Sequence, residues 1–413
     1  MIHFNQFTLE NGLKIFVHED KTTPMCVFNL MYDVGAKDEN PQKTGFAHLF
    51  EHLMFGGSVN IANYDIAAQN AGATNNAFTS NDLTNYYLTL PAFNLETAFW
   101  LESDRMLSLA FSPESLEVQR KVVIEEFKQR YLNQPYGDVW LHLRSLAYTT
   151  HPYQWATIGK EIAHIENATL EDVKNFFYQF YRPNNAILVV AGNTTTEQVK
   201  NLSQKWFADI PKGQPYHRNL PKEPTQTTQR KLVVEANVPL DALYMVFHSE
   251  ARYEDSFFAT DLLSDILGRG KSSRLYQILV KEKQLFNSIS ASITNSIEEG
   301  LFIIQGTLNP TITHQEAENA VWQVIKSIQD NKVADKELQK VKNKAETSEV
   351  MSEIELLNRA IMIATYALNG RENEINQRIN LIQSVNSDDI LRSAKKILTK
   401  ENSSVLYYAK TQK

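Results

Sequence analysis

Hydrophobic and polar positions follow the same order in two stretches of the chain that lie far apart. From Phe7 to Val34 the pattern predicts β-strands, and a mostly apolar helix that carries His48 and His52 follows. From Lys231 to Ser249 the pattern again predicts strands, followed by a helix from Ser256 to Leu267. The two stretches therefore predict the same succession of strands and then a helix.

The ends of the two halves are also alike. A helix is predicted from Leu170 to Tyr181 and a buried strand from Ala186 to Ala191. Near the C-terminus a helix is predicted from Ser387 to Leu398 and a strand from Ser404 to Ala409. We interpret this as a weak internal duplication and predict an α+β fold with two homologous α/β-sandwich domains in tandem.

A linker is predicted between the two halves. Residues 211–228 are polar and show little hydrophobic periodicity. They contain four prolines: Pro211, Pro215, Pro221 and Pro224. A chain of 413 residues is also too long for one ordinary core. We predict an N-terminal domain over residues 1–210, the linker over 211–228 and a C-terminal domain over 229–413.

Composition and charge narrow the classes of function. The chain has 41 basic and 48 acidic residues and no basic run, which argues against nucleic acid as a partner. Cys26 is the only cysteine, so no internal disulfide is possible. No apolar stretch reaches about 18 residues, so no membrane span is expected. The N-terminus lacks the pattern of a signal peptide, so we expect a cytoplasmic protein unless an export signal has been removed.

Candidate chemistry is concentrated in the run His48-Leu49-Phe50-Glu51-His52. Two histidines four residues apart share one face of a helix, and Glu51 lies on the same side. Imidazole suits zinc, and a nearby carboxylate can take a proton from a water molecule on the metal. The order H-x-x-E-H reverses the commoner H-E-x-x-H and is the signature of inverzincins.

A chance meeting of two histidines and a glutamate on an amphipathic helix is the alternative. The neighbouring positions argue against it, because they are mostly apolar and predict burial. These positions are Ala47, Phe50, Leu53, Met54 and Phe55. Buried histidines and a buried carboxylate need partners, and a metal ion supplies one.

A catalytic zinc site needs a third protein ligand, and the helix-like segment 117–127 offers Glu126. Glu126 follows Val122 and Val123 at helical spacing and so lies in the apolar stripe, whereas Glu125 lies nearer its edge. Gln119 is two turns before Glu126 on the same face, where it can support the ligand by a hydrogen bond. A solvated Glu-Glu pair on an ordinary helix is the alternative.

A hairpin is predicted between these two helices. Residues 80–82 are Ser, Asn and Asp, which mark a turn, and the segments 75–79 and 83–90 on either side are strand-like. Beside a peptidase centre, an exposed strand edge can pair with an extended substrate backbone. A purely structural hairpin is the commoner meaning of the pattern.

Together these motifs resemble the insulysin–pitrilysin family of zinc peptidases. The resemblance rests on the run from Gly45 to Ser58, the strand Asn76-Ala77-Phe78-Thr79 and the helix from Val122 to Phe127. It covers nearly the whole chain and points to the short, mitochondrial-processing-peptidase-like bacterial branch. The resemblance implies two homologous α+β domains in each subunit, and two subunits around a chamber.

The resemblance also implies roles for individual residues. His48, His52 and Glu126 would bind Zn²⁺, and Glu51 would be the general base. The substrate main chain would bind along the edge strand at Asn76, Ala77, Phe78 and Thr79. The expected reaction is hydrolysis of peptides or unfolded segments by a zinc-dependent endopeptidase.

The chain departs from the family pattern in two places. Members often have a glutamate where this chain has Gln119. Many active members also have an arginine and a tyrosine, seven residues apart, in the second domain, where this chain has Val280 and Asn287. A shifted alignment would bring Lys281 or Lys283 into play. We therefore expect a homodimer, or a heterodimer with a homologous subunit that supplies the Arg/Tyr pair.

Two other functions stay open at this point. One is a non-catalytic peptide-binding or scaffold subunit of a heteromeric peptidase. The other is a zinc amidohydrolase that acts on small substrates. The complete H-x-x-E-H motif argues against the first, and only the expected peptide-binding strand argues against the second.

Overall fold

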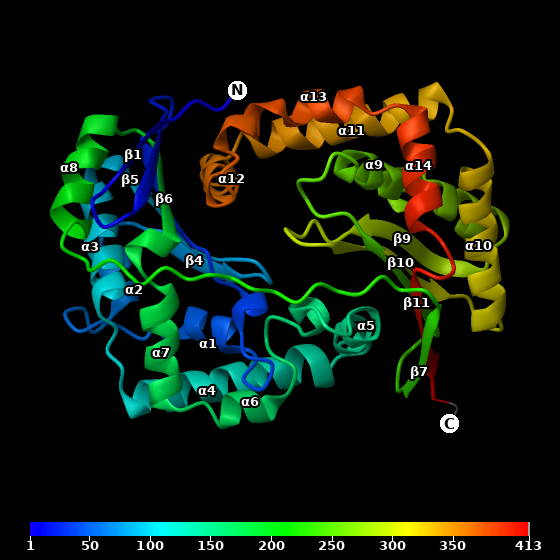
Figure 1. Cartoon of the computed structure of the whole chain (residues 1–413), viewed down its shortest axis with the longest axis horizontal. Helices are drawn as coiled ribbons and strands as arrows, with labels where there is room; N and C mark the ends of the chain where they lie inside the picture. Colours follow the sequence, from blue (N-terminus) through cyan, green and yellow to red (C-terminus); the bar gives the residue numbers. More distant parts are fainter. Residues whose placement is uncertain (412–413) are drawn as a thin grey trace. The chain divides into compact units, whose positions relative to one another are not determined.

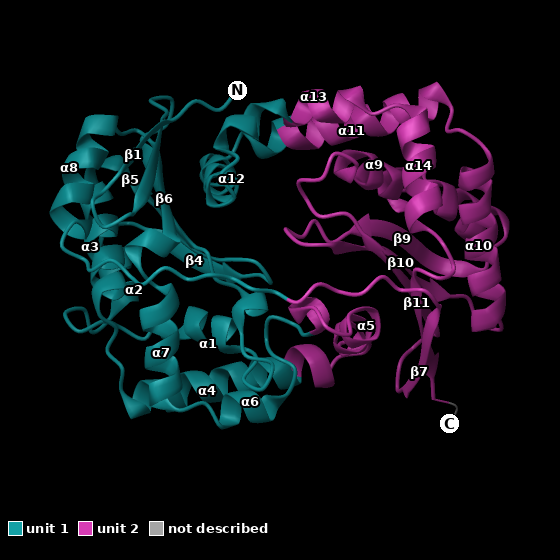
Figure 2. Ribbon diagram, in the orientation of Figure 1, with its two compact units in different colours: residues 1–128, 155–220, 350–377 teal, residues 129–154, 221–349, 378–413 magenta. Residues whose placement is uncertain are grey.

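The computed structural model describes residues 1–411, which form two compact units (Figures 1 and 2). Unit 1 comprises residues 1–128, 155–220 and 350–377, and unit 2 comprises the remaining segments. Each unit is built on one mixed β-sheet with helices packed on it. Each unit is described below by itself.

The sheet of unit 1 has six strands in the order β1-β2-β6-β3-β5-β4. The strands are β1 (Asn5–Thr8), β2 (Lys14–Glu19), β3 (Met25–Tyr32), β4 (Thr74–Thr79), β5 (Thr84–Pro91) and β6 (Ala186–Gly192). β2 and β6 are parallel, and every other neighbouring pair is antiparallel. β4 is therefore an edge strand, paired only with β5.

The sheet of unit 2 has five strands in the order β7-β11-β8-β10-β9. They are β7 (Arg230–Ala236), β8 (Ala242–Ser249), β9 (Phe286–Ile293), β10 (Gly300–Leu308) and β11 (Ser403–Lys410). Its first pair is parallel and the others are antiparallel. This is the order and orientation of β2-β6-β3-β5-β4, so the predicted α+β fold with a duplicated domain is confirmed.

Helices cover one face of each sheet. In unit 1 they are α1 (Phe46–Leu53), α2 (Tyr64–Asn70), α3 (Leu95–Leu107), α4 (Pro113–Phe127), α6 (Ile162–Glu166), α7 (Leu170–Phe180) and α8 (Thr196–Phe207). In unit 2 they are α9 (Phe257–Gly268), α10 (His314–Asp330), most of α11 (Asp335–Ser352), α13 (Arg378–Ser384) and α14 (Ser387–Ile397). Phe28 of β3 packs against Phe99 of α3 and Phe207 of α8, which places the unit 1 core between sheet and helices.

The local sequence explains why equivalent helices begin where they do. α7 and α14 each precede the last strand of their sheet, and each starts with a capping box. Thr169 and Asp172 form the box of α7, and Asn386 and Asp389 form that of α14. In each box the side chain of the first residue accepts the backbone N–H of the second, and the side chain of the second accepts the backbone N–H of the first. These N–H groups would otherwise have no partner in the first helical turn.

The opposite face of each sheet is covered by a helix from the other half of the sequence. α12 (Leu356–Leu368) packs on β3 and β6 in unit 1, on the face opposite α3 and α8 (Figure 1). α5 (Val139–Ala147) packs on β7, β8 and β11 in unit 2, where Leu143 lies among buried side chains of that sheet. The contacts therefore divide the chain differently from the sequential division at residues 210 and 229, which stays a prediction.

Residues 211–228 form neither helix nor strand, and both ends of this segment are bound to the unit in which they lie. Arg218 donates to Asp38 in unit 1, with an Nε–Oδ1 distance of 2.7 Å. In unit 2 the carboxylate of Glu223 accepts the backbone N–H groups of residues 149–151. These contacts fix the segment at two points.

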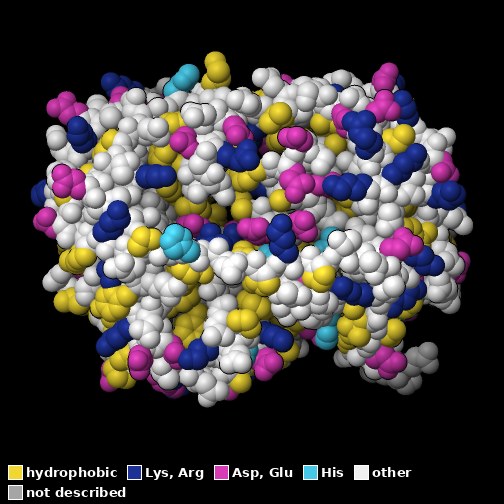
Figure 3. Space-filling model, viewed as in Figure 1, with side chains coloured by type: hydrophobic (Ala, Val, Ile, Leu, Met, Phe, Trp, Pro, Cys, Tyr) yellow, Lys and Arg dark blue, Asp and Glu magenta, His cyan; other side chains and the backbone are white. Residues whose placement is uncertain are grey.

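Charges of both signs are mixed over the visible face of each unit, and no large patch of one sign appears there (Figure 3). This fits the net charge of −7. Among residues 1–411, no helix combines the length and the apolar character needed to cross a membrane.

Candidate functional site

The helix that carries the H-x-x-E-H motif begins at a closely packed turn. Gly45, just before α1, has a φ of +87°, and a Cβ at this position would lie 2.6 Å from the carbonyl oxygen of Ile158. The buried Glu39 carboxylate accepts the N–H groups of Gly45 and Ala47 at 2.9 and 2.8 Å. Burial raises the pKa of Glu39 to about 8, against the lowering effect of these two N–H groups. Glycine and Glu39 together fix where α1 starts.

One face of α1 is buried and the opposite face carries the histidines. Leu49 and Phe50 are fully buried, and the Phe50 ring stacks on Tyr181 with centroids 4.7 Å apart. The side chains of His48 and His52 keep 12% and 23% of their surface exposed. The packed face holds the helix while the imidazoles remain accessible to a ligand.

The two histidines and Glu126 come together, although Glu126 lies on another helix, α4. Oε2 of Glu126 is 3.7 Å from Nε2 of His48 and 3.3 Å from Nε2 of His52, and the three ligand atoms lie within 4.8 Å of one another. Ligand atoms at zinc–ligand distances in a tetrahedral site are about 3.3–3.6 Å apart. The donor set suits a zinc ion, and both distances from Glu126 are close to this spacing. Within residues 1–411 it is the only such group of three or more potential ligands.

Neighbouring residues on α4 differ from Glu126 in their environment. Glu125 is 61% exposed and pairs with Lys128 at 2.7 Å, whereas Glu126 is 18% exposed and faces the histidines. Gln119 is partly buried two turns earlier on the same helix. Its supporting role stays a prediction.

Glu51 points toward the end of strand β4. Its Oε2 accepts a hydrogen bond of 2.6 Å from the hydroxyl of Thr79, the last residue of that strand. The sequence predicted Thr79 only as part of the substrate-binding strand and missed this contact. The alternation of side chains along β4 could have indicated the contact. It places Thr79 and Ala77 on one side of the strand and Phe78 and Asn76 on the other.

The edge of β4 shows the side chains expected of a binding strand. Asn76 and Phe78 are exposed, whereas Ala77 and Thr79 are partly buried. The side-chain oxygen of Asn76 accepts the backbone N–H of Ala77 at 2.8 Å. Substrate binding along this strand stays a prediction. The groups best placed for it are the backbone edge and the exposed side chains of Asn76 and Phe78, because the Thr79 hydroxyl is bonded to Glu51.

A buried ion pair lies beside the site, and no pattern in the sequence had predicted it. Arg105 of α3 and Glu102 are fully buried and joined at 2.6 Å. The Arg105 guanidinium also lies 4.4 Å from the ring centre of Tyr86 and 4.8 Å from that of Tyr64. The hydroxyl of Tyr64 donates to Glu102 at 2.7 Å, whereas Nη1 of Arg105 is buried without a hydrogen-bond partner among the described residues and faces aromatic rings.

In the second domain, the two positions at which the sequence departs from the expected Arg/Tyr pair differ in burial. Val280 lies in the π-helical segment 276–282 and packs against the hydrophobic core of unit 2. Asn287 is exposed on β9. Of the two nearby lysines, Lys283 donates to Gln323 at 2.9 Å. Val280 thus has a packing role in this chain.

The fold and the site geometry agree with matches to known proteins. Residues 14–161 match the family model of insulinase (peptidase family M16), and residues 167–345 match the model of the peptidase M16 inactive domain. The chain belongs to the insulinase, or M16, family of peptidases. The family resemblance found in the sequence is thereby confirmed.

Individual relatives cover most of the chain. It is 31% identical to the zinc protease PqqE of Helicobacter pylori over 81% of this chain and 77% of that protein. It is 24% identical to the β subunit of the mitochondrial-processing peptidase of Saccharomyces cerevisiae over 83% of this chain and 77% of the subunit. The crystal structure of a protease from Helicobacter pylori superposes with a TM-score of 0.92 at 27% identity, covering 99% of this chain and all of that one.

Proposed function

We propose that this chain is a zinc-dependent endopeptidase that hydrolyses peptides or unfolded segments. The observation that carries the proposal is the convergence of His48, His52 and Glu126 beside Glu51. Relatives named as zinc proteases support it. Zinc, when bound, would polarise the scissile carbonyl and acidify a water molecule.

The residues of this chain have distinct roles in the proposed reaction. His48 and His52 would hold the metal by their imidazole nitrogens, and Glu126 would hold it by a carboxylate oxygen. Glu51 accepts the proton of the attacking water and passes it to the leaving amine nitrogen. Its place on α1, one residue before His52, keeps this carboxylate next to the ligands.

The proposed substrate lies in an extended conformation along β4. This strand is at the sheet edge, so its outward backbone groups can add a further strand. Asn76 and Phe78 offer exposed side chains beside that edge. Backbone pairing recognises extended peptides over folded proteins, and it argues against the alternative of a hydrolase for small amides.

The test is the variant Glu51→Gln. The amide preserves the shape of the side chain and is no metal ligand, so we expect the variant to bind zinc as wild type does. Loss of general acid–base catalysis should lower turnover of a quenched peptide by about 10²- to 10⁴-fold. Glu125→Gln is the matched control and should keep its activity, because Glu125 is exposed and pairs with Lys128. Near-normal turnover by zinc-loaded Glu51→Gln would exclude the assigned role.

A second proposal concerns assembly. Where active relatives carry an arginine and a tyrosine, this chain has Val280 and Asn287, neither of which can donate strongly to a developing oxyanion. We propose that full activity needs a homologous subunit that supplies such donors. Loss of one oxyanion donor typically costs about 10²- to 10³-fold in rate. One relative is named as a subunit of a processing peptidase, which fits such pairing.

The partner proposal is tested by assaying the purified chain alone and with a candidate partner that lacks H-x-x-E-H. A rate increase of about 10²-fold in the mixture is the expected result. Equal rates on several unfolded peptides would contradict it and favour a homodimer that works without the pair or uses Lys281 or Lys283. A zinc-free chain that binds peptides without turnover, even in the mixture, would instead indicate a scaffold subunit.

A further inference from the structure

We propose that Thr79 is a positioning residue that holds the carboxylate of Glu51 in its working orientation, an inference that rests on the proposed peptidase function. The Thr79 hydroxyl donates to Oε2 of Glu51 at 2.6 Å. This is the length of a charge-assisted O–H···O⁻ bond, about twice as strong as a neutral one. Such a bond fixes the plane of a carboxylate that must receive a proton along a defined direction.

The Thr79 hydroxyl is held in place by its strand. Side chains alternate along β4, so Ala77 and Thr79 point toward the side on which α1 packs. Thr79 pairs with Thr84 on β5, and the Thr84 hydroxyl donates to the carbonyl oxygen of Val34 at 2.9 Å. A β-branched side chain has few rotamers, which keeps the donor directed at Glu51.

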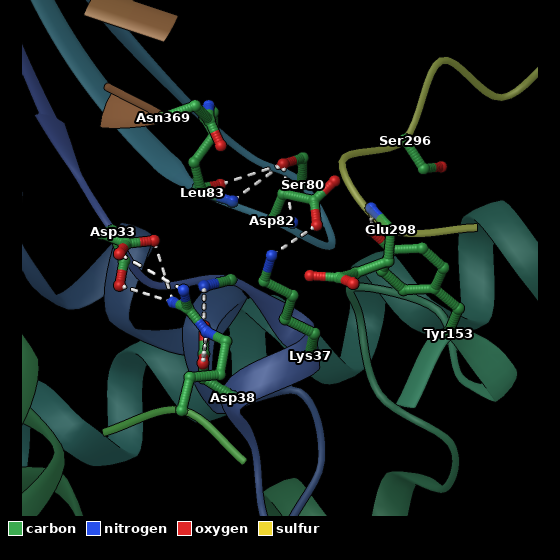
Figure 4. A network of polar contacts seen from close by, with 12 residues as sticks. Asp33, Lys37, Asp38, Ser80, Asp82, Leu83, Tyr153, Ser296, Glu298 and Asn369 are labelled. Carbon is green, nitrogen blue, oxygen red and sulfur yellow. Dashed lines mark hydrogen bonds and ion pairs between the residues drawn. The ribbon is translucent and has the colours of Figure 1, made fainter. Parts of the chain in front are cut away.

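The strand ends in a tight turn immediately after Thr79. The Ser80 hydroxyl oxygen accepts the N–H groups of Asp82 and Leu83 at 3.1 and 3.0 Å. The backbone N–H of Ser80 donates to the carbonyl oxygen of Leu83 at 2.9 Å. Figure 4 shows Ser80, Asp82 and Leu83 gathered at this turn. The turn therefore leaves little freedom in the backbone that carries Thr79.

The same turn is bound to the segment 35–39. The N–H groups of Ala36 and Lys37 donate to the carbonyl oxygens of Ser80 and Asn81. The Lys37 side chain is 3% exposed, and its ammonium group pairs with Asp82 at 2.9 Å (Figure 4). A lysine buried to this degree needs a charged partner, so the pair ties the turn to the segment.

The segment 35–39 also holds the helix that carries Glu51. Its last residue, Glu39, accepts the first N–H groups of α1, while Ala36 and Lys37 bind the turn after Thr79. One short stretch of chain therefore sets the distance between the hydroxyl and the carboxylate. Thr79 therefore contacts the carboxylate of Glu51 whether or not a substrate is bound along β4.

The experiment compares Thr79→Val, which removes the hydroxyl at nearly constant volume, with Thr79→Ser, which retains it. Thr8→Val, on the exposed strand β1 at the opposite edge of the same sheet, is the matched control. Zinc content, kcat and KM are measured for each, and crystal structures of the Thr79 variants report the position of the Glu51 carboxylate. We expect Thr79→Val to lower kcat by about 10- to 100-fold, the usual effect of losing an orienting hydrogen bond.

In the expected result, KM and zinc content of Thr79→Val stay within about twofold of wild type, Thr79→Ser recovers most of kcat, and the Glu51 carboxylate moves only in the valine variant. Three results would overturn the proposal: unchanged kcat in Thr79→Val, a loss confined to KM, or a loss shared by Thr8→Val. A wild type that is inactive both alone and with a homologous partner subunit would contradict the proposed peptidase function instead, and the position of Glu51 in the crystals would still decide the role of Thr79.

Discussion

Replacement of Glu126 by alanine tests the geometry of the proposed zinc site most directly. The change removes one of three ligand atoms, the one that lies 3.3 and 3.7 Å from the two imidazole nitrogens. Zinc binding by four-ligand sites is worth about 10–16 kcal/mol, or roughly 2.5–4 kcal/mol for each ligand. Since about 1.4 kcal/mol corresponds to a factor of ten, we expect zinc affinity to fall by about 10²- to 10³-fold.

Glu125→Ala provides the matched control on the same helix. Glu125 is 61% exposed and pairs only at the surface with Lys128, so its loss should change stability by less than about 1 kcal/mol. Zinc affinity should stay at the wild-type value. The two variants differ by one position in sequence, and any general effect on α4 should appear in both.

The assay is competition for zinc with a chromophoric chelator, with zinc content of the purified proteins as a second measurement. Circular dichroism and thermal unfolding of the metal-free proteins establish that both variants are folded. If Glu125→Ala loses as much zinc affinity as Glu126→Ala, or more, the assignment from the helix face is wrong. If both variants keep wild-type affinity, the third ligand lies elsewhere.

Two further predictions concern the framework around the site. Arg105→Met should lower the free energy of unfolding by about 3–5 kcal/mol, because it leaves Glu102 charged and buried without its partner. Urea unfolding measures this change, and a loss below about 1 kcal/mol would contradict the prediction. The hydroxyl and N–H of Thr22, together with Arg359 of α12, lower the pKa of Asp20 from 3.8 to about 2. The contacts of the Asp20 carboxylate should therefore stabilise the fold above pH 4 and lose that contribution as the pH falls toward 2. The difference in unfolding free energy between wild type and Asp20→Asn should shrink over this range.

Local patterns in the sequence were enough to predict many elements. The last helix and strand of each half, such as α7 and β6, were placed to within one or two residues, because apolar periodicity and capping residues are local signals. The turn at residues 80–82 was predicted for the same reason. The duplication was established only by the order of the strands in the two sheets. That order depends on pairing between distant segments such as β7 and β11.

The parts that could not be predicted depend on contacts between distant segments. An amphipathic helix such as α12 displays an apolar face, but nothing in its sequence says which sheet that face covers. Glu39 lies in a polar stretch between Asp38 and Asn40 and resembles a surface residue, yet it is buried against the start of α1. The sequence located His48 and His52 through their spacing, whereas the supporting contacts left no comparable pattern.

The positions of α5 and α12 bear on how a chain of this kind arises. Each half carries a helix that packs on the sheet of the other half, so neither half closes both faces of its own sheet. Two separate copies of one half could close both faces only by exchanging these helices in an intertwined dimer, and fusion of the two copies would make that exchange permanent. Among residues 1–411 only the first half holds a group of three potential metal ligands. The second half is still required, because it supplies the helix that covers the sheet of the first.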